Sequence, residues 1–261
     1  MRYFAITKER SSSVGFEKAM KNNGWKVIFL KSIIISPKPY LEIKYMVSRI
    51  IQTNYDACVF LSGNAVDILM SNAESTGCML ALVSRIRSIR TFCIGPRTKE
   101  KLSHYGIDSA IIPETYDTSG LLDCISSYKN QVHRIAIPRS QLGDSCIFMS
   151  LSRLGFSVDQ FQLYNTSTNP IIDNEWRLFF HLLANRKIDA VGFTSPSSVR
   201  ALFEIVERGL SSDDMIYLRG LKGLISIGHK TTKELRKHAS GRVIEAAEHT
   251  LGGIVETSKS I

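Results

Sequence analysis

Two stretches of the chain repeat one pattern, and this repetition most limits how the chain can fold. Each begins with an aspartate and a short apolar run and then changes to small residues that carry hydroxyl or amide groups: residues 56–66 and 189–199. Ser62 and Ser195 occupy equivalent places, 133 positions apart. An apolar run followed by a residue suited to helix capping is typical of a buried strand that leads into a helix. The pattern therefore indicates a duplicated strand-to-helix unit.

The duplication extends beyond these two stretches. The same separation relates residues 94–98 to residues 227–231, and a separation of 131 positions relates residues 24–27 to residues 155–158. Ala5 falls on Ala136 at this second separation. We therefore expect the first half of the chain to repeat in the second half.

Short β-branched or aromatic runs alternate with amphipathic stretches, which predicts parallel α/β sheets. The strand candidates are residues 3–7, 26–30, 57–61, 91–94, 109–112, 134–137, 157–163, 190–194, 224–227 and 242–246. Four helical patterns end in a glycine just before a strand, where glycine can adopt the left-handed conformation. These glycines are Gly24, Gly106, Gly155 and Gly241.

The length of 261 residues suggests about two domains of about 130 residues each. Two proline-bearing polar stretches, residues 35–39 and 164–170, are candidates for crossings between domains. They permit a central domain, about residues 37 to 166, inserted into a domain made from both chain ends. A tandem arrangement that divides near residues 129–132 would satisfy the repeat equally well.

The composition is that of a folded soluble protein, with a surplus of positive charge. Lys and Arg number 33 against 24 Asp and Glu, a net charge of +9. The basic residues are spread along the chain and form no arginine-rich arm, so nucleic acid is a weaker explanation than solubility or a polyanionic small molecule. Lys31 interrupts the apolar run 27–35, which argues against a membrane span or signal peptide. Five cysteines without a CxxC pair suggest free thiols in the cytoplasm.

Six strand ends carry helix-capping or basic residues. In open parallel sheets, ligands bind beyond the carboxyl ends of strands, where helices present unpaired backbone N–H groups. The six ends are residues 7–8, 62–64, 95–98, 138–140, 195–198 and 228–231. Each residue alone is explained by helix capping, but the matched set in both halves predicts an anion-binding cleft.

Signatures of other chemistries are missing from the sequence. It contains no GxGxxG, no GxxxxGK[ST] and no GxSxG motif, and its histidines lack metal-ligand spacing. His229 lies at a proposed ligand edge, although an exposed loop position accounts for it. The sequence therefore gives no support for a dinucleotide site, a P-loop nucleotide site, a metal site or a nucleophilic serine.

The chain resembles the uroporphyrinogen-III synthase family. The resemblance covers nearly the whole chain and is carried by residues 94–98, 155–158, 164–166, 193–199 and 250–253, together with Thr231. It implies an α/β fold of two similar domains, each a parallel sheet flanked by helices. The domains, residues 1–34 plus 168–261 and residues 37–165, would be joined by a two-segment hinge with the active-site cleft between them.

The resemblance also implies an activity in tetrapyrrole and heme biosynthesis. Enzymes of this family close linear hydroxymethylbilane to uroporphyrinogen III, with loss of water and inversion of the last pyrrole ring. They use no metal or organic cofactor, and the substrate carries eight carboxylates. We expect a cytoplasmic monomer whose partner is this small molecule rather than nucleic acid or a membrane.

By the same resemblance, Tyr164 is the catalytic candidate, because it matches the family tyrosine that helps the hydroxyl group depart. The substrate-binding candidates share a place at a strand end or at the start of a helix. They are Ser62, Gly63, Asn64, Gly95, Arg97, Thr98, Arg139, Ser195, Ser197, Ser198, Gly228 and Thr231.

Two other hypotheses remain open from the sequence. The first is a non-catalytic regulatory or sensor protein of the same fold that binds an acidic metabolite. The second is nucleic-acid binding driven by the charge of +9, which a steep salt dependence of DNA affinity would support.

Overall fold

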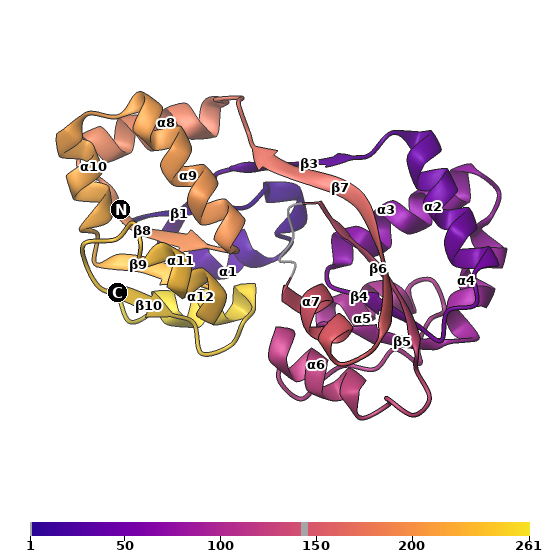
Figure 1. Ribbon diagram of the computed structural model, residues 1–261. Helices are drawn as coiled ribbons and strands as arrows, with labels where there is room; N and C mark the ends of the chain where they lie inside the picture. Colours follow the sequence, from indigo (N-terminus) through magenta and orange to yellow (C-terminus); the bar gives the residue numbers. More distant parts are fainter. Residues whose placement is uncertain (1, 142–145) are drawn as a thin grey trace. The chain divides into compact units, whose positions relative to one another are not determined.

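The computed structural model describes residues 2–141 and 146–261, which fold into two units (Figure 1). Unit 1 consists of Met1–Ile34 together with Ser167–Ile261, and unit 2 consists of Ile35–Thr166. The chain passes between the units twice, once within strand β3 (Ile33–Pro37) and once within strand β7 (Ser157–Thr168).

Unit 1 is a parallel five-stranded sheet of order β10-β9-β8-β1-β2. Its strands are β1 (Arg2–Ile6), β2 (Trp25–Phe29), β8 (Ile188–Phe193), β9 (Gly223–Ser226) and β10 (Val243–Glu245). Its helices are η1 (Arg10–Ser12), α1 (Phe16–Asn22), α8 (Asn174–Ala184), α9 (Pro196–Gly209), α10 (Ser212–Arg219), α11 (His229–Leu235) and α12 (Leu251–Ser258). Successive residues of β1 serve opposite faces: Ala5 packs in one core, and Phe4 and Ile6 pack in the other.

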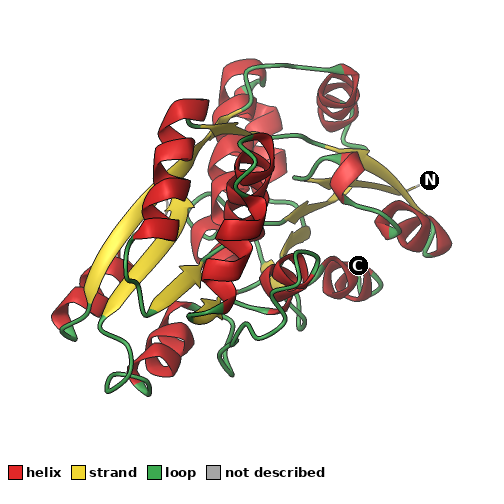
Figure 2. Cartoon of the chain, turned by 90° about the vertical axis from the view of Figure 1, so that its right-hand side faces the viewer, coloured by secondary structure: helices red, strands yellow, loops and turns green. Residues whose placement is uncertain are grey.

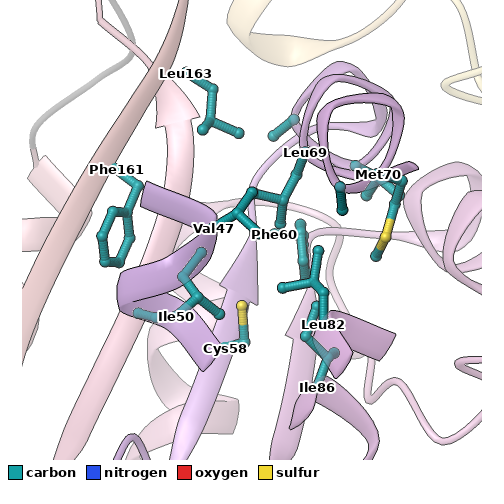
Figure 3. Packing of buried hydrophobic residues seen from close by; sticks show 14 of the residues in the cluster. Val47, Ile50, Cys58, Phe60, Leu69, Met70, Leu82, Ile86, Phe161 and Leu163 are labelled. Carbon is teal, nitrogen blue, oxygen red and sulfur yellow. The ribbon is translucent and has the colours of Figure 1, made fainter. Parts of the chain in front are cut away.

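Unit 2 is a five-stranded sheet of order β3-β7-β6-β4-β5. Its further strands are β4 (Ala57–Phe60), β5 (Arg90–Cys93) and β6 (Arg134–Ser140). Its helices are α2 (Tyr40–Gln52), α3 (Gly63–Ser75), α4 (Met79–Arg87), α5 (Pro96–Ser103), α6 (Thr118–Ser126) and α7 (Cys146–Arg153). Cys58 and Phe60 of β4 pack with side chains of α2, α3 and α4 (Figure 3), whereas Ala57 and Val59 face the core that α6 and α7 cover.

The duplication is visible in the strand register. The order β7-β6-β4-β5 in unit 2 corresponds to β2-β1-β8-β9 in unit 1. Each residue pair between β4 and β5 has an equivalent pair between β8 and β9, 133 positions later in the sequence. Likewise, the residue pairs between β1 and β2 from Tyr3 onwards have equivalent pairs between β6 and β7, 131 positions later. Examples are Ala57 with Arg90 against Ala190 with Gly223, and Arg134 with Ser157 against Tyr3 with Lys26. Both separations in the sequence therefore reflect one repeated sheet.

The predicted α/β class is confirmed, because each unit has parallel strands with helices beside them (Figure 2). The predicted strand 109–112 is wrong: Ile111 forms only an isolated bridge with Phe92. Its equivalent in unit 1 is Ile244 of β10, which pairs with Ile225 of β9. Pro113 follows directly and has no N–H to extend the pairing, which explains why this edge stays short.

The sequence did not indicate β3, and this strand makes the sheet of unit 2 mixed rather than wholly parallel. Lys38 N donates to Leu163 O at 2.8 Å, and Asn169 N donates to Ser32 O at 2.9 Å. This pairing runs in opposite directions along the two segments, so β3 and β7 are antiparallel. The prolines at 37 and 39 favoured a linker, but Pro37 is the last residue of an edge strand, where proline is tolerated.

The left-handed conformation predicted for four glycines is found at three of them. Gly24, Gly106 and Gly155 have φ angles of 80°, 73° and 90°, in the left-handed region. Gly241 is not in that region, so this prediction is wrong. A Cβ there would lie 3.3 Å from the carbonyl oxygen of Gly220, so the absence of a side chain serves close backbone packing instead.

Candidate active site

Tyr164 and Ser62 meet at the carboxyl end of β4 in unit 2. Ser62 caps α3 and accepts a hydrogen bond from Ala65 N at 3.2 Å. Its hydroxyl also lies 2.9 Å from the phenol oxygen of Tyr164 in β7, although the residues are 102 positions apart. Tyr164 is 4% exposed. The sheet thus places a buried phenol at the N-terminus of a helix.

The environment of Tyr164 keeps its phenol protonated. Burial raises its pKa above the ordinary value of 10.0, and hydrogen bonds with Ser62 and Asn64 and the nearby positive charge of Arg139 offset part of this rise. A neutral phenol can donate a hydrogen bond or a proton at neutral pH. This is the protonation state that a general acid requires.

Arg139 lies at the end of β6 and is 4% exposed. Its Nε donates to Ser140 O at 3.0 Å, and its guanidinium also donates to the side-chain oxygen of Gln160. A buried charge is tolerated only where such partners replace water. Arg139 is therefore a fixed positive charge close to Tyr164.

A second helix of unit 2 begins after β5. Gly95 caps α5 with extended backbone, Pro96 occupies its first position, and Thr98 N donates to Gly95 O at 3.1 Å. Thr98 is 4% exposed, whereas Arg97 is exposed. Gly63, at the start of α3, faces the aliphatic part of Lys101, since a Cβ on Gly63 would lie 2.6 Å from Lys101 Cδ.

In unit 1, Ser195 and Ser198 form a capping box at the start of α9. Each side chain accepts the backbone N–H of the other at 3.1 Å. Ser198 is fully buried, and its hydroxyl also accepts from Thr7 Oγ1 at 2.9 Å and donates to Ser195 O at 2.8 Å. Ser198 therefore anchors the turn, while the half-buried Ser195 and Ser197 lie closer to solvent.

The start of α11 repeats the arrangement at α5. Gly228 caps the helix with extended backbone, and Thr231 N donates to Gly228 O at 2.9 Å. Thr231 is 3% exposed, and His229 is exposed. The Thr232 hydroxyl lies 3.3 Å from the carbonyl oxygen of Gly228 and within bonding distance of the Glu245 carboxylate, so one of these two oxygens accepts its proton at the turn.

The family assignment follows from the whole chain. The sequence profile of the uroporphyrinogen-III synthase HemD family matches residues 15–256. This chain belongs to that family. A relative from Methanothermobacter thermautotrophicus is 30% identical over 145 residues, and this match spans 56% of each protein. The uroporphyrinogen-III synthase of Chlorobaculum parvum is 20% identical over 237 residues, 91% of this chain and 89% of that protein.

The fold is also that of a solved member of the family. A mutant uroporphyrinogen III synthase from the extremely thermophilic bacterium Thermus thermophilus superimposes with a TM-score of 0.68 at 17% identity, and the match covers 100% of this chain and 98% of that one. At this identity the similarity concerns the fold. The resemblance that the sequence suggested is thereby confirmed.

Two aromatic residues that sequence reasoning missed lie against the capping glycines in this member of the uroporphyrinogen-III synthase family. A Cβ on Gly95 would lie 3.3 Å from Tyr116 Cβ, and a Cβ on Gly228 would lie 2.8 Å from His249 Cδ2. Tyr116 is 52% exposed, and the His249 side chain is 55% exposed. The two residues are 133 positions apart, so the repeat itself was the signal that could have found them.

The same repeat places another helix beside each ring. Asp117 caps α6 and accepts from Gly120 N at 2.9 Å, and Thr250 caps α12 and accepts from Gly253 N at 3.0 Å. Each ring therefore lies between the starts of two helices of its own unit. His249 Nε2 also lies 3.9 Å from a carboxylate oxygen of Glu245.

The described part of this family member contains neither a metal-type cluster nor a membrane-spanning helix, and two of its thiols are buried. Residues 2–141 and 146–261 contain no cluster of three or more His, Cys, Asp or Glu side chains suited to a metal ion. Burial raises the pKa of the Cys93 thiol to about 11, and burial raises that of Cys58 further. These thiols are therefore poor nucleophiles. Within the same residues, no helix is both long and apolar enough to span a membrane.

Proposed function

We propose that this chain closes hydroxymethylbilane to uroporphyrinogen III and that Tyr164 assists the departure of the hydroxyl group. The observation that carries this proposal is the buried, protonated phenol of Tyr164, held at the start of α3 by the hydroxyl of Ser62. The hydroxyl group must leave as water, and a neutral phenol can supply the hydrogen bond or proton that this step needs.

Six of the remaining candidates are proposed to bind the carboxylates of the substrate. Helix starts favour anions because their backbone N–H groups are unpaired and their dipoles are positive at this end. Ser62, Thr98, Ser195, Ser197 and Thr231 would provide hydroxyl groups at four such starts. Arg97, which is exposed at the start of α5, would add a positive charge.

Other candidates are proposed to act by shape and position. Gly63, Gly95 and Gly228 leave room for the side chains packed against the first turns, Asn64 lies beside Tyr164, and Ser198 holds the turn of Ser195 through its buried hydroxyl. Arg139 is proposed to orient negative charge near Tyr164.

We also propose, as the family resemblance implies, that this dehydration with ring closure uses no metal or organic cofactor. We further propose a monomer with domains at residues 1–34 plus 168–261 and at residues 37–165. In this proposal β3 and β7 form the two-segment hinge. The small tetrapyrrole is the proposed partner, in the cytoplasm.

An assay that resolves product isomers tests the proposal. Purified protein should convert hydroxymethylbilane to the type III isomer without added metal. Recovery of only the type I isomer, which forms spontaneously, would contradict it and favour the non-catalytic sensor. Tyr164→Phe should lower kcat by roughly tenfold to a hundredfold, at or below the low end for general acid catalysis. An unchanged kcat would remove Tyr164 from the mechanism.

A further inference from the structure

Unit 2 contains a second polar site at the amino ends of its strands. A cavity of about 670 Å³ lies there, a size typical of small-molecule sites. Asp56 immediately precedes β4 and Arg90 begins β5, whereas Ser62 and Gly95 follow the same strands at their other ends. The cavity is therefore separate from the residues proposed to bind the tetrapyrrole.

The charge of the lining is positive. Arg85, Arg87 and Arg90 line the cavity, and Asp56 is the acidic residue among the lining residues. The Asp56 carboxylate already accepts the backbone N–H groups of His133 at 2.9 Å and Arg134 at 2.8 Å. Burial raises its pKa, but these two hydrogen bonds and the charge interactions with His133 and Arg85 outweigh burial and bring the pKa below the ordinary value. Asp56 is thus bound to the backbone and interacts with Arg85, and in the described residues it forms no ion pair with Arg87 or Arg90.

The three arginines are engaged to different degrees. Arg85 donates to Thr53 O at 3.0 Å and Tyr55 O at 2.9 Å, so it supports the chain after α2. Arg90 bonds to the side chain of Gln131 and lies 4.7 Å from the ring centre of Tyr128. Arg87 is the exposed last residue of α4, and its guanidinium forms no hydrogen bond or ion pair with any residue in the described ranges.

The repeat provides an internal control for this charge. The positions 133 later in unit 1 are Leu218, Gly220 and Gly223, none of which is charged. Asp189, the equivalent of Asp56, still bonds to the backbone, since Tyr3 N donates to it at 2.8 Å.

The packing at this place in unit 1 is also different. A Cβ on Gly223 would lie 2.6 Å from Ala190 Cβ, so the backbone there is closely packed. The aspartate is therefore common to both halves, whereas arginines at these three positions occur in unit 2 alone. Arg85 supports the chain after α2, so the exposed guanidinium of Arg87 is the charge that the fold itself does not explain.

We propose that this cavity binds a small anion through Arg87 and Arg90, by phosphate or carboxylate groups. Guanidinium groups form paired, charge-assisted hydrogen bonds with both kinds of oxyanion. The side chains of Ile89 and Ile111, which also line the cavity, would contact an apolar part of the ligand. The proposal does not depend on the tetrapyrrole reaction.

Calorimetric titration of the full chain with pyrophosphate and, separately, with citrate tests this proposal. The wild-type protein should bind at least one of them, and the arm with the lower Kd identifies the preferred group. Arg87→Gln and Arg90→Gln should each raise that Kd by about tenfold, the loss of one charge-assisted hydrogen bond. Arg153→Gln is the matched control, because Arg153 is an exposed residue of unit 2 that does not line the cavity.

Equal Kd values in all four proteins, or no binding of either anion, would overturn the proposal. Arg87→Gln keeps the test valid if Arg90→Gln disturbs folding through the loss of its bond to Gln131. Conversion of hydroxymethylbilane by Arg87→Gln should equal that of wild type without added anion. An inactive wild-type protein that still binds the anion through Arg87 would contradict the proposed function alone.

Discussion

At the scale of single residues, the contact between Ser62 and Tyr164 combines two roles. The Ser62 hydroxyl caps α3 and also bonds to the phenol of Tyr164. The buried phenol has lost most of its contact with water, so its position depends on this partner. The Ser62 hydroxyl therefore connects the start of α3 to the residue that is proposed to assist the reaction.

Ser62→Ala should therefore affect both stability and turnover. Loss of the cap should cost about 1 kcal/mol of unfolding free energy. Loss of the bond to Tyr164 should also lower kcat by about three- to tenfold. Ser211→Ala is the control, because Ser211 caps α10 in the same way but has no contact with a proposed site residue. An equal kcat in the two variants, measured with denaturation curves for both, would show that Ser62 is only a cap.

Tyr164 should titrate above the ordinary tyrosine pKa of 10.0. The phenol is neutral below its pKa, so the folded protein holds this proton more tightly than the unfolded chain does. The associated stabilisation is present below pH 10.0 and is lost as pH rises through the higher folded-state pKa. The difference in phenolate absorbance between wild type and Tyr164→Phe measures this pKa. A value at or below 10.0 would contradict the burial that we describe.

At the scale of elements, each unit contains the same arrangement, a helix that begins at a capping glycine with an aromatic residue packed against that glycine. Gly95 with Tyr116 and Gly228 with His249 are the two instances. Neither glycine has a left-handed φ angle, so backbone freedom does not require glycine there. Glycine is required there because the ring needs the space: a Cβ on Gly228 would lie 2.8 Å from His249.

A double-mutant cycle tests the contact between Gly228 and His249. Gly228 caps α11, whose start is proposed to bind a carboxylate. Gly228→Ala should therefore displace the His249 ring from this start and raise KM by about fivefold, and His249→Ala should raise KM similarly. The double variant should resemble His249→Ala alone, because the two residues act through one contact. Gly209→Ala is the control, since a Cβ there meets Phe180 at an ordinary 3.6 Å. Additive effects in steady-state kinetics would separate the two residues.

At the scale of the whole molecule, two units have separate cores. The buried hydrophobic clusters found in the described ranges each draw their residues from one unit. The two segments that make up unit 1 are also joined close to where the chain leaves this unit and returns to it, because the N–H of Asn169 donates to the carbonyl oxygen of Ser32. Each unit thus contains the interactions that a domain needs to fold alone.

Unit 2, expressed as residues 33–168 so that β3 and β7 are complete, should fold alone. Its far-ultraviolet circular dichroism should show mixed α/β structure, and it should unfold cooperatively on heating. Unit 1 should do the same when a short glycine-rich loop replaces residues 35–166. A fragment without a cooperative transition would show that its core depends on the other unit.

The sequence by itself determined the class of the fold, the repeat and the capping residues. These are local or periodic properties: apolar runs specify buried strands, and Ser62 and Ser195 cap helices through bonds to residues three positions away. The repeat was readable because the two halves kept the same spacing in both sheets.

Only the tertiary structure decided which distant residues meet. The strand at 109–112 was wrong because Pro113 cannot extend the edge pairing, and β3 was missed because its prolines favoured a linker although β7 pairs with it. The contact of Tyr164 with Ser62, the rings against Gly95 and Gly228, and the arginine-lined cavity likewise depend on segments that the fold brings together. Hydrogen bonds and packing between remote segments leave no local pattern in the chain, so they become visible only when the sheet brings those segments together.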